Sequence, residues 1–236
     1  MKKLGTLLLI PTVISENTTA LVLPEMVIQT IYTLDEFIVE DEKSARRFLK
    51  SIQYPKSLND LTLHVLNKHT NQNDIPLFIQ SLENGKDIGL LSEAGCPCIA
   101  DPGSVVVNLA HQKNIPVKPL VGPSSILLAL IASGFNGQHF LFHGYLPIEK
   151  SFRIKKIKEL EFNSKRESQT QIFMETPFRN MQLLNDLLNT CNSETKLCIA
   201  VDITGINEFI QTKSMSAWKK SLPELHKRTA IFLLST

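Results

Sequence analysis

The sequence predicts an α/β protein of two domains, and three observations support this. Residues 1–119 alternate short apolar segments with helical patterns, as a doubly wound, mostly parallel sheet does. Residues 120–236 contain successive strand-like segments without long helices between them, which favours a mixed, largely antiparallel sheet. The chain has 236 residues, enough for two small domains. We therefore expect an N-terminal α/β domain over 1–119 and a C-terminal α+β domain over 120–236, packed closely around a ligand cleft.

In the first half, apolar segments and helix signals follow one another in a regular order. Strands are predicted at residues 6–11, 36–40, 88–91 and 117–120. Pro24 begins a helix that carries Val27, Ile28 and Ile31 on one face. Asp41 is the expected N-cap of a helix over 41–52. Further helices are predicted over 74–85 and 105–113.

In the second half, helices and strands are grouped differently. Helices are predicted over residues 124–133, 151–162 and 177–190. Strands are predicted over residues 140–145, 171–175, 197–203, 208–212 and 230–234. Three of these strands come in succession at the end of the chain, which is the reason for expecting an antiparallel arrangement there.

The composition is that of an ordinary globular protein. Hydrophobic residues make up 43% of the chain and charged residues 20%, which argues against a disordered, collagen-like or coiled-coil chain. No apolar run reaches the roughly 18 to 20 residues of a membrane span, so we expect a soluble, cytoplasmic protein. Cys96 and Cys98 match neither a disulfide framework nor paired zinc-ligand spacing. We expect free thiols and no metal.

The net charge of +2 is unevenly distributed. Residues 1–119 carry 11 basic and 13 acidic side chains, and residues 120–236 carry 14 and 10. An anionic partner would therefore be attracted to the second half.

The stretch LLSEAGCPCIADPG, residues 90–103, leaves a predicted strand and enters a helix. Its small residues Ser92 and Gly95 allow the backbone to approach a ligand closely, and a loop at the carboxyl end of a parallel strand is a usual ligand site. An ordinary strand-to-helix loop is the alternative interpretation. No GxGxxG motif follows any strand, which disfavours a nucleotide-dependent oxidoreductase.

A second loop, PLVGPSSILLAL over residues 119–130, joins a strand to a strongly apolar helix. Ser124 and Ser125 stand where that helix begins, so their hydroxyls and amides can cap the helix, bind a ligand, or do both.

These loops, together with several short blocks elsewhere, resemble the tetrapyrrole methylase family of S-adenosylmethionine-dependent methyltransferases. The similarity is greatest to the branch that methylates a ribose of small-subunit ribosomal RNA, ribosomal small subunit methyltransferase I. The remaining blocks, in order, are LLLIPT (7–12), VEDEKSARRF (39–48), FHGYLP (142–147), METPFR (174–179) and AVDIT (200–204). The loop PTVISEN, residues 11–17, departs from the branch because it lacks the usual glycine and asparagine.

The resemblance implies a two-domain tetrapyrrole-methylase-like fold, a homodimer and S-adenosyl-L-methionine as cofactor. It also implies where the cofactor binds. The implied contacts are Ile10, Glu93, Cys96, Ser124, Ser125, Met174, Val201 and Ala230. The small loop residues Ser92 and Gly95 are predicted cofactor contacts as well.

A ribose hydroxyl is a poor nucleophile while protonated, so a base should activate it. The preferred candidates are Asp41, Glu42 and His64, ahead of Glu175 and Asp202. Asp41 also suits a helix cap, and Glu175 can pair with a basic residue four positions on. Glu93 and Asp101 suit either the cofactor or local loop hydrogen bonds.

Basic residues gather in two clusters. Each cluster can contact RNA phosphates or can be merely a solvated surface. One cluster comprises Lys150, Arg153, Lys155, Lys156 and Lys158, and the other Lys213, Lys219, Lys220, Lys227 and Arg228. The sequence therefore predicts a methyltransferase, with ribosomal small-subunit RNA as substrate. The alternatives are a tetrapyrrole or other small-molecule acceptor, and a non-catalytic module that binds S-adenosylmethionine or RNA.

Overall fold

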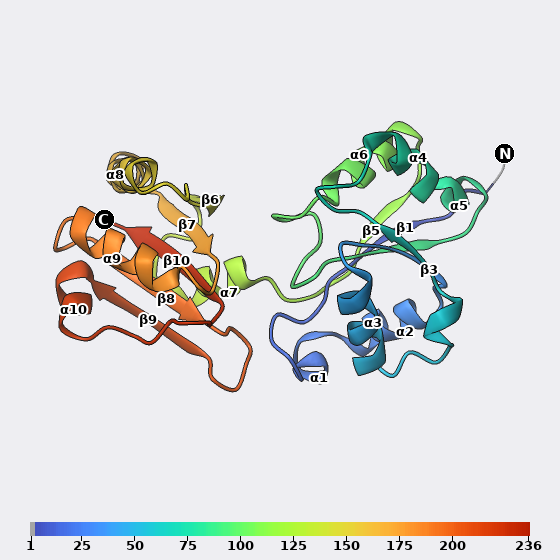
Figure 1. Cartoon of the computed structure of the whole chain (residues 1–236), viewed down its shortest axis with the longest axis horizontal. Helices are drawn as coiled ribbons and strands as arrows, with labels where there is room; N and C mark the ends of the chain where they lie inside the picture. The colour runs from blue at the N-terminus through green and yellow to red at the C-terminus, as the bar shows by residue number, and fades with distance from the viewer. Residues whose placement is uncertain (1–2) are drawn as a thin grey trace. The chain divides into compact units, whose positions relative to one another are not determined.

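The computed structural model describes residues 3–236 and forms two compact units, Met1–Ser124 and Ser125–Thr236 (Figure 1). Each unit contains one five-stranded sheet with a hydrophobic core on each face. The sequence predicts a boundary near residue 119, at the end of a predicted strand, whereas the two units divide after Ser124, where the next helix begins.

The sheet of the first unit is entirely parallel, with the strand order β3-β2-β4-β1-β5. Its strands are β1 (Leu7–Ile10), β2 (Glu36–Val39), β3 (Thr62–Val65), β4 (Ile88–Leu91) and β5 (Val117–Pro119). Leu9 in β1 lies opposite Leu90 in β4 and Pro119 in β5, so β1 is an inner strand. The parallel sheet predicted for this half is confirmed.

Helices cover both faces of this sheet (Figure 1). Leu8 and Ile10 face a core shared with α1 (Thr19–Val22), α2 (Glu25–Tyr32) and α3 (Glu42–Ser51). Leu7 faces the other core, beneath α4 (Ile75–Phe78), α5 (Gln80–Glu83) and α6 (Ser104–Gln112). Because β1 is buried on both faces, its sequence is an unbroken apolar run rather than an alternating one.

Three parts of the first unit differ from the sequence prediction, and the first is α1, which precedes the helix predicted from Pro24. Strand β3 was not predicted, because it is a four-residue edge strand whose partly exposed sequence, Thr-Leu-His-Val, contains only two apolar residues. The single helix expected over residues 74–85 is instead the short helices α4 and α5, after a 3₁₀ turn at Gln72–Asp74. A second 3₁₀ turn, Leu58–Asp60, precedes β3.

The sheet of the second unit is mixed, with the order β6-β7-β10-β8-β9. Its strands are β6 (Phe140–Tyr145), β7 (Thr170–Glu175), β8 (Lys196–Val201), β9 (Phe209–Ser214) and β10 (Ala230–Ser235). Only β6 and β7 are parallel, and the other pairs are antiparallel. The mixed, largely antiparallel sheet predicted for this half is confirmed.

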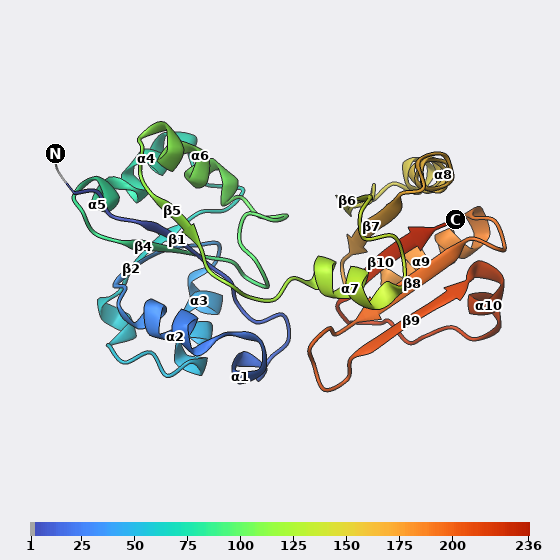
Figure 2. The same cartoon turned by 180° about the vertical axis from the view of Figure 1, so that it is seen from behind.

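Helix α7 (Ser125–Ser133) packs on one face of this sheet through Ala129 and Leu130 (Figure 2). The helices α8 (Lys150–Glu167), α9 (Asn180–Thr190) and α10 (Met215–Lys220) pack on the other. A buried ion pair joins α8 to α9, since Arg153 lies 2.7 Å from Asp186 and is 1% exposed. Within residues 3–236, no helix is long and apolar enough to cross a membrane.

Candidate active site

Strands β1 and β4 are neighbours whose connections lead to opposite faces of the parallel sheet. The chain runs from β1 to α1 and α2 on one face, and from β4 to α6 on the other. A crevice outside the carboxyl ends of the strands is expected at such a switch point, and open α/β sheets bind their ligands there. The loops that follow β1 and β4 are therefore the first place to look for a site.

A buried hydrogen-bond network joins these two loops. The amide of Thr12 donates to the carbonyl of Gly95 at 3.0 Å, and the Thr12 hydroxyl donates to the carbonyl of Ser92 at 3.2 Å. The Ser92 hydroxyl donates to the Gly95 carbonyl as well. Ser92, predicted as a cofactor contact, thus uses its side chain to hold the loop, and its amide donates to the carbonyl of Ile10 at 3.4 Å.

Two glycines bring the loop after β5 into contact with the other two. A Cβ atom at Gly122 would lie 2.2 Å from Cγ of Pro11, so no other residue fits there without movement. Gly95 has a φ of +74°, and a Cβ atom there would lie 3.3 Å from the carbonyl oxygen of Pro123. The Cys96 thiol lies 3.4 Å from that same oxygen, and burial raises its pKa, so it stays protonated.

Asp101 organises the end of the loop after β4. Its carboxylate accepts hydrogen bonds from the amides of Cys98, at 2.8 and 2.9 Å, and Gly103, at 2.8 Å. These bonds lead the chain from Cys98, which has a φ of +68°, into α6. Of the two roles that the sequence left open for Asp101, the structure shows local loop hydrogen bonds.

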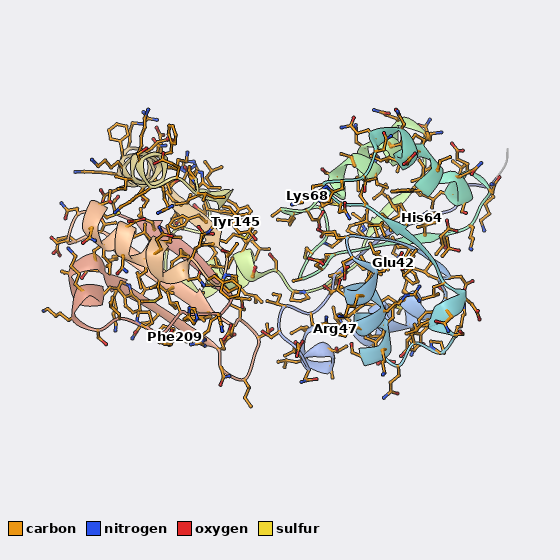
Figure 3. All side chains as sticks on the ribbon, in the orientation of Figure 1. Glu42, Arg47, His64, Lys68, Tyr145 and Phe209 are labelled. Atoms are coloured by element: carbon orange, nitrogen blue, oxygen red, sulfur yellow. The ribbon has the colours of Figure 1, made fainter. Side chains whose placement is uncertain are left out.

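A cavity of about 490 Å³ opens beside this loop, a volume in the range of small-molecule sites. It is built from the segments that follow β2, β3 and β4. Its lining residues are Glu40, Asn67, Lys68, Glu93, Ala100, Asp101 and Pro102. Three carboxylates and one ammonium group, Lys68 (Figure 3), thus surround the same space.

Glu40 is the most perturbed of these carboxylates. Burial, together with the negative charges of Asp101 and Glu93, raises the pKa of Glu40 to about 7. The group therefore changes charge near neutral pH, as a general base is required to do. Glu40 is not among the bases predicted from the sequence, although its place as the last residue of the strand predicted over 36–40 was the available signal.

The raised pKa of Glu40 predicts a pH-dependent stability. In the unfolded chain the carboxyl loses its proton near pH 4.5, and in the folded protein near pH 7, so the folded state loses stability as pH rises between these values. Glu40→Gln removes this loss. We expect Glu40→Gln to stabilise the protein more at pH 8 than at pH 5, measured by urea unfolding.

The matched control is Glu83→Gln, a partly exposed glutamate of α5 that pairs with Lys113. Its effect on the free energy of unfolding should be small at both pH values. A Glu40→Gln effect that is equal at pH 5 and pH 8 would contradict the raised pKa.

The three predicted bases all have structural partners (Figure 3 labels two of them). Asp41 caps α3 by accepting a hydrogen bond of 2.8 Å from the Ser44 amide, and the bonds from Ser44 lower the pKa of Asp41. Glu42 lies 3.7 Å from Arg46, one turn along α3. His64 Nε2 lies 2.8 Å from Glu36, and its ring stacks on Phe78 with centroids 5.1 Å apart. None of the three lines the 490 Å³ cavity.

The other predicted cofactor contacts of the first unit differ in how far their side chains are exposed to a ligand. Ile10 is fully buried in the core beneath α2 and α3, which leaves only its backbone to meet a ligand. Glu93 is exposed and lines the cavity, where its carboxylate also accepts a hydrogen bond of 3.2 Å from Ser44. Ser124 is the last residue of this unit, and Ser125 is the first residue of α7.

In the second unit, Met174, Val201 and Ala230 lie at the same end of the sheet. Ala230 is opposite Val201, and the residue after it, Ile231, is opposite Met174. The side chains of Val201 and Ala230 belong to the core beneath α8 and α9, whereas Met174 packs on the α7 face. The structure therefore brings the three backbones together but not the three side chains.

Glu175 and Asp202, the less favoured bases, are both paired with arginines. Glu175 lies 2.6 Å from Arg179, and Asp202 lies 2.7 Å from Arg228. The Asp202 carboxylate also accepts a hydrogen bond of 3.1 Å from the Thr229 amide. Among residues 3–236, no group of histidines, cysteines or carboxylates is placed to hold a metal ion.

Comparison with solved structures defines the class of protein to which this fold belongs. The chain matches the methyltransferase CobJ with a TM-score of 0.63 and 14% identity, over 99% of this chain and 94% of that one. It matches diphthine synthase with a TM-score of 0.69 and 11% identity, over 98% of this chain and 90% of that one. The fold is that of the two-domain tetrapyrrole methylases.

Sequence relatives narrow this class to one family. The chain is 32% identical to the ribosomal RNA small subunit methyltransferase I of Streptococcus pyogenes over 218 residues. This match covers 91% of this chain and 70% of the relative. The chain is also 32% identical over 184 residues to the corresponding protein of Vibrio cholerae, over 78% of this chain. The chain belongs to the ribosomal RNA small subunit methyltransferase I family.

The curated relatives are longer than the matched region. The match spans 61% of the Vibrio cholerae protein and 59% of the Buchnera aphidicola (Schizaphis graminum) protein. No family model matches the chain.

Proposed function

We propose that this protein is an S-adenosylmethionine-dependent methyltransferase that acts on a ribose 2′-oxygen of small-subunit ribosomal RNA. Membership of the ribosomal RNA small subunit methyltransferase I family supports the substrate class. The observation that carries the chemistry is the cavity at the carboxyl end of the parallel sheet, where Glu40 has a pKa of about 7. Its volume suits a nucleoside-sized group.

The loop after β4 fits the proposed cofactor. S-adenosylmethionine supplies a methyl group on a positively charged sulfur, and it carries hydroxyl, amino and carboxylate groups to be recognised. Gly95 allows close approach of the backbone, and the exposed Glu93 carboxylate can accept from a hydroxyl or an amino group. The remaining candidate contacts are Ile10, Ser92, Cys96, Ser124, Ser125, Met174, Val201 and Ala230.

For these remaining candidates, we propose roles that follow from their burial. Ile10, Val201 and Ala230 are buried in cores and would contribute their backbones. Ser92 would position the loop through its hydrogen bond to Gly95. No sulfur nucleophile is required, which agrees with the raised pKa of Cys96.

In the proposed reaction, Glu40 acts as general base. Its ionised carboxylate accepts the proton that the ribose hydroxyl loses as the oxygen–methyl bond forms. The sulfur–methyl bond of S-adenosylmethionine would break in the same displacement, with S-adenosylhomocysteine as the leaving group. Burial, together with the neighbouring Asp101 and Glu93, raises the pKa of this carboxylate enough for it to accept that proton. Lys68, on the same cavity, provides a positive charge for an acceptor phosphate.

The proposal is tested by offering labelled S-adenosylmethionine with three acceptors in parallel. These are undermethylated small ribosomal subunits, their deproteinised RNA and a uroporphyrin-type tetrapyrrole. We expect label in one of the RNA-containing samples and none in the tetrapyrrole. Label in the tetrapyrrole alone would replace the RNA acceptor by the small-molecule alternative. Binding of S-adenosylhomocysteine without any transfer would favour the non-catalytic alternative.

We also propose that the protein works in the cytoplasm as a homodimer. The proposed substrate supports the location, because ribosomal subunits lie in the bacterial cytoplasm. Apolar side chains that remain exposed in the second unit support self-association. They include Ile131, Tyr145 and Ile148, which are 78%, 55% and 71% exposed. Sedimentation equilibrium that reports the mass of a single chain would contradict the dimer.

A further inference from the structure

Helix α8 presents a basic face with an aromatic ring at its centre. The helix packs on the second unit through Arg153, Ile157, Leu160 and Ser164, which are all buried. The opposite face carries Lys155, Lys158, Phe162, Lys165 and Arg166, and all five are exposed. Their spacing of three, four, three and one residues places them along one stripe of the helix. We call these five residues the α8 stripe.

The charges of the α8 stripe are mostly unneutralised. Within residues 3–236, Lys155, Lys158 and Lys165 make no salt bridge. Of the three acidic side chains of the same helix, Glu167 pairs with Arg166 of the stripe at 2.6 Å, and the other two are used elsewhere. Glu159 pairs with Lys156 at 2.6 Å, and Glu161 accepts a hydrogen bond of 2.7 Å from the Asn192 amide on a neighbouring segment.

Phe162 is the unusual member, because the solvent face of a helix is normally polar. Its side chain is 59% exposed. The Arg166 guanidinium carbon lies 5.3 Å from its ring centroid, so one cation already stands against the ring. An aromatic ring flanked by cations is the combination that binds unpaired nucleotides, since the ring stacks on a base and the cations meet phosphates.

We propose that the α8 stripe binds a single-stranded segment of the RNA substrate, with Phe162 stacked on a base and Lys155, Lys158 and Lys165 on phosphates. This inference rests on the proposed function, because it takes RNA to be the acceptor. The opposite charges of the stripe and RNA support it, and so does the net positive charge of residues 120–236. Of the basic cluster predicted on this helix, Arg153 does not belong to the binding surface, because it is buried against Asp186 and cannot reach RNA.

The second predicted basic cluster offers a weaker surface. Lys213 lies over the ring of Trp218 at 4.6 Å, and Arg228 is paired with Asp202. Lys219 and Lys220 are exposed at the end of α10, but the ring beside them, Trp218, is 1% exposed and cannot stack on a base. These two lysines therefore provide a matched control with the same charge change.

The test measures the affinity of the full chain for deproteinised small-subunit ribosomal RNA across a range of salt concentrations. We expect Lys155→Ala/Lys158→Ala to weaken binding about tenfold and to lower the slope of log affinity against log salt by roughly 1.4. Phe162→Ala should weaken binding about tenfold without changing that slope. Phe162→Trp, which keeps an aromatic ring, should bind RNA with the wild-type affinity. Lys219→Ala/Lys220→Ala should bind as wild type does.

Two controls separate this inference from the proposed function. Every variant should bind S-adenosylhomocysteine as wild type does, which shows that the fold is intact. If wild type methylates the RNA but the α8 variants bind it as tightly as Lys219→Ala/Lys220→Ala, the inference is wrong and the function stands. If wild type neither binds nor methylates the RNA, both are wrong.

Discussion

Glu40→Gln should lower the rate of methyl transfer to RNA by about 10² to 10⁴, the usual contribution of a general base. Glutamine keeps the size of the side chain but cannot accept the proton of the acceptor hydroxyl. Binding of S-adenosylhomocysteine should change little, because the proposed contact of Glu40 is with the acceptor. The rate is best measured in a single turnover with saturating RNA, so that product release does not hide the loss.

The wild-type pH profile gives an independent check on Glu40. Since the ionised carboxylate is the active form, the rate should rise with pH through a pKa of about 7 and then level off. This rise should be absent from the residual activity of Glu40→Gln. Glu83→Gln, the partly exposed control on α5, should keep the wild-type rate and profile.

The same assay also tests the sequence-based candidates for the base. Glu42→Gln and His64→Gln should each reduce the rate far less than Glu40→Gln, because neither side chain lines the cavity. A loss of 10² or more in either variant, with Glu40→Gln near wild type, would return the role of base to that residue.

Gly95→Val should weaken S-adenosylhomocysteine binding about 100-fold, a loss of about 2.7 kcal/mol. At a φ of +74° a β-branched side chain is strongly disfavoured, and the Cβ atom would press on the Pro123 carbonyl oxygen. The loop must therefore change conformation, and with it the bonds that Gly95 makes to Thr12 and Ser92. Binding is measured by titration calorimetry.

Gly134→Val is the matched control for backbone strain. Gly134 has the same φ of +74°, but nothing lies within 4 Å of a Cβ atom placed there. Both variants should lose stability, and only Gly95→Val should lose affinity. A folded Gly95→Val protein that binds S-adenosylhomocysteine as tightly as Gly134→Val would remove this loop from the cofactor site.

Much of the fold is predictable from the sequence because the inner strands are buried on both faces. The apolar runs of β1 and β4 are continuous for that reason, and both strands were predicted. Asp41 was also predicted as a cap, from its position before a helical pattern, and its side chain does cap α3. In these cases the sequence pattern and the structural feature that it predicts are formed by the same few neighbouring residues.

The cavity was harder to predict because its walls come from distant segments. Strand β3 is half-exposed at the edge of the sheet, so its alternating sequence did not stand out, and Asn67 and Lys68 beyond it were overlooked. The pKa of Glu40 is raised by burial and by the charges of Asp101 and Glu93, which reach it from another strand end. A pattern within a few residues does not show that these carboxylates are close to one another. They are close because the strand order β3-β2-β4 places the ends of β2 and β4 side by side.

The most direct test of the proposed activity is the chemical position of the transferred methyl group. Small-subunit RNA labelled by this protein from S-adenosylmethionine is digested to nucleosides, and the label is located by chromatography and mass spectrometry. We predict a single nucleoside with the methyl group on the ribose 2′-oxygen, absent when Glu40→Gln is used for the same time. Label on a base, or no label in RNA from either intact subunits or deproteinised RNA, would contradict ribose methylation.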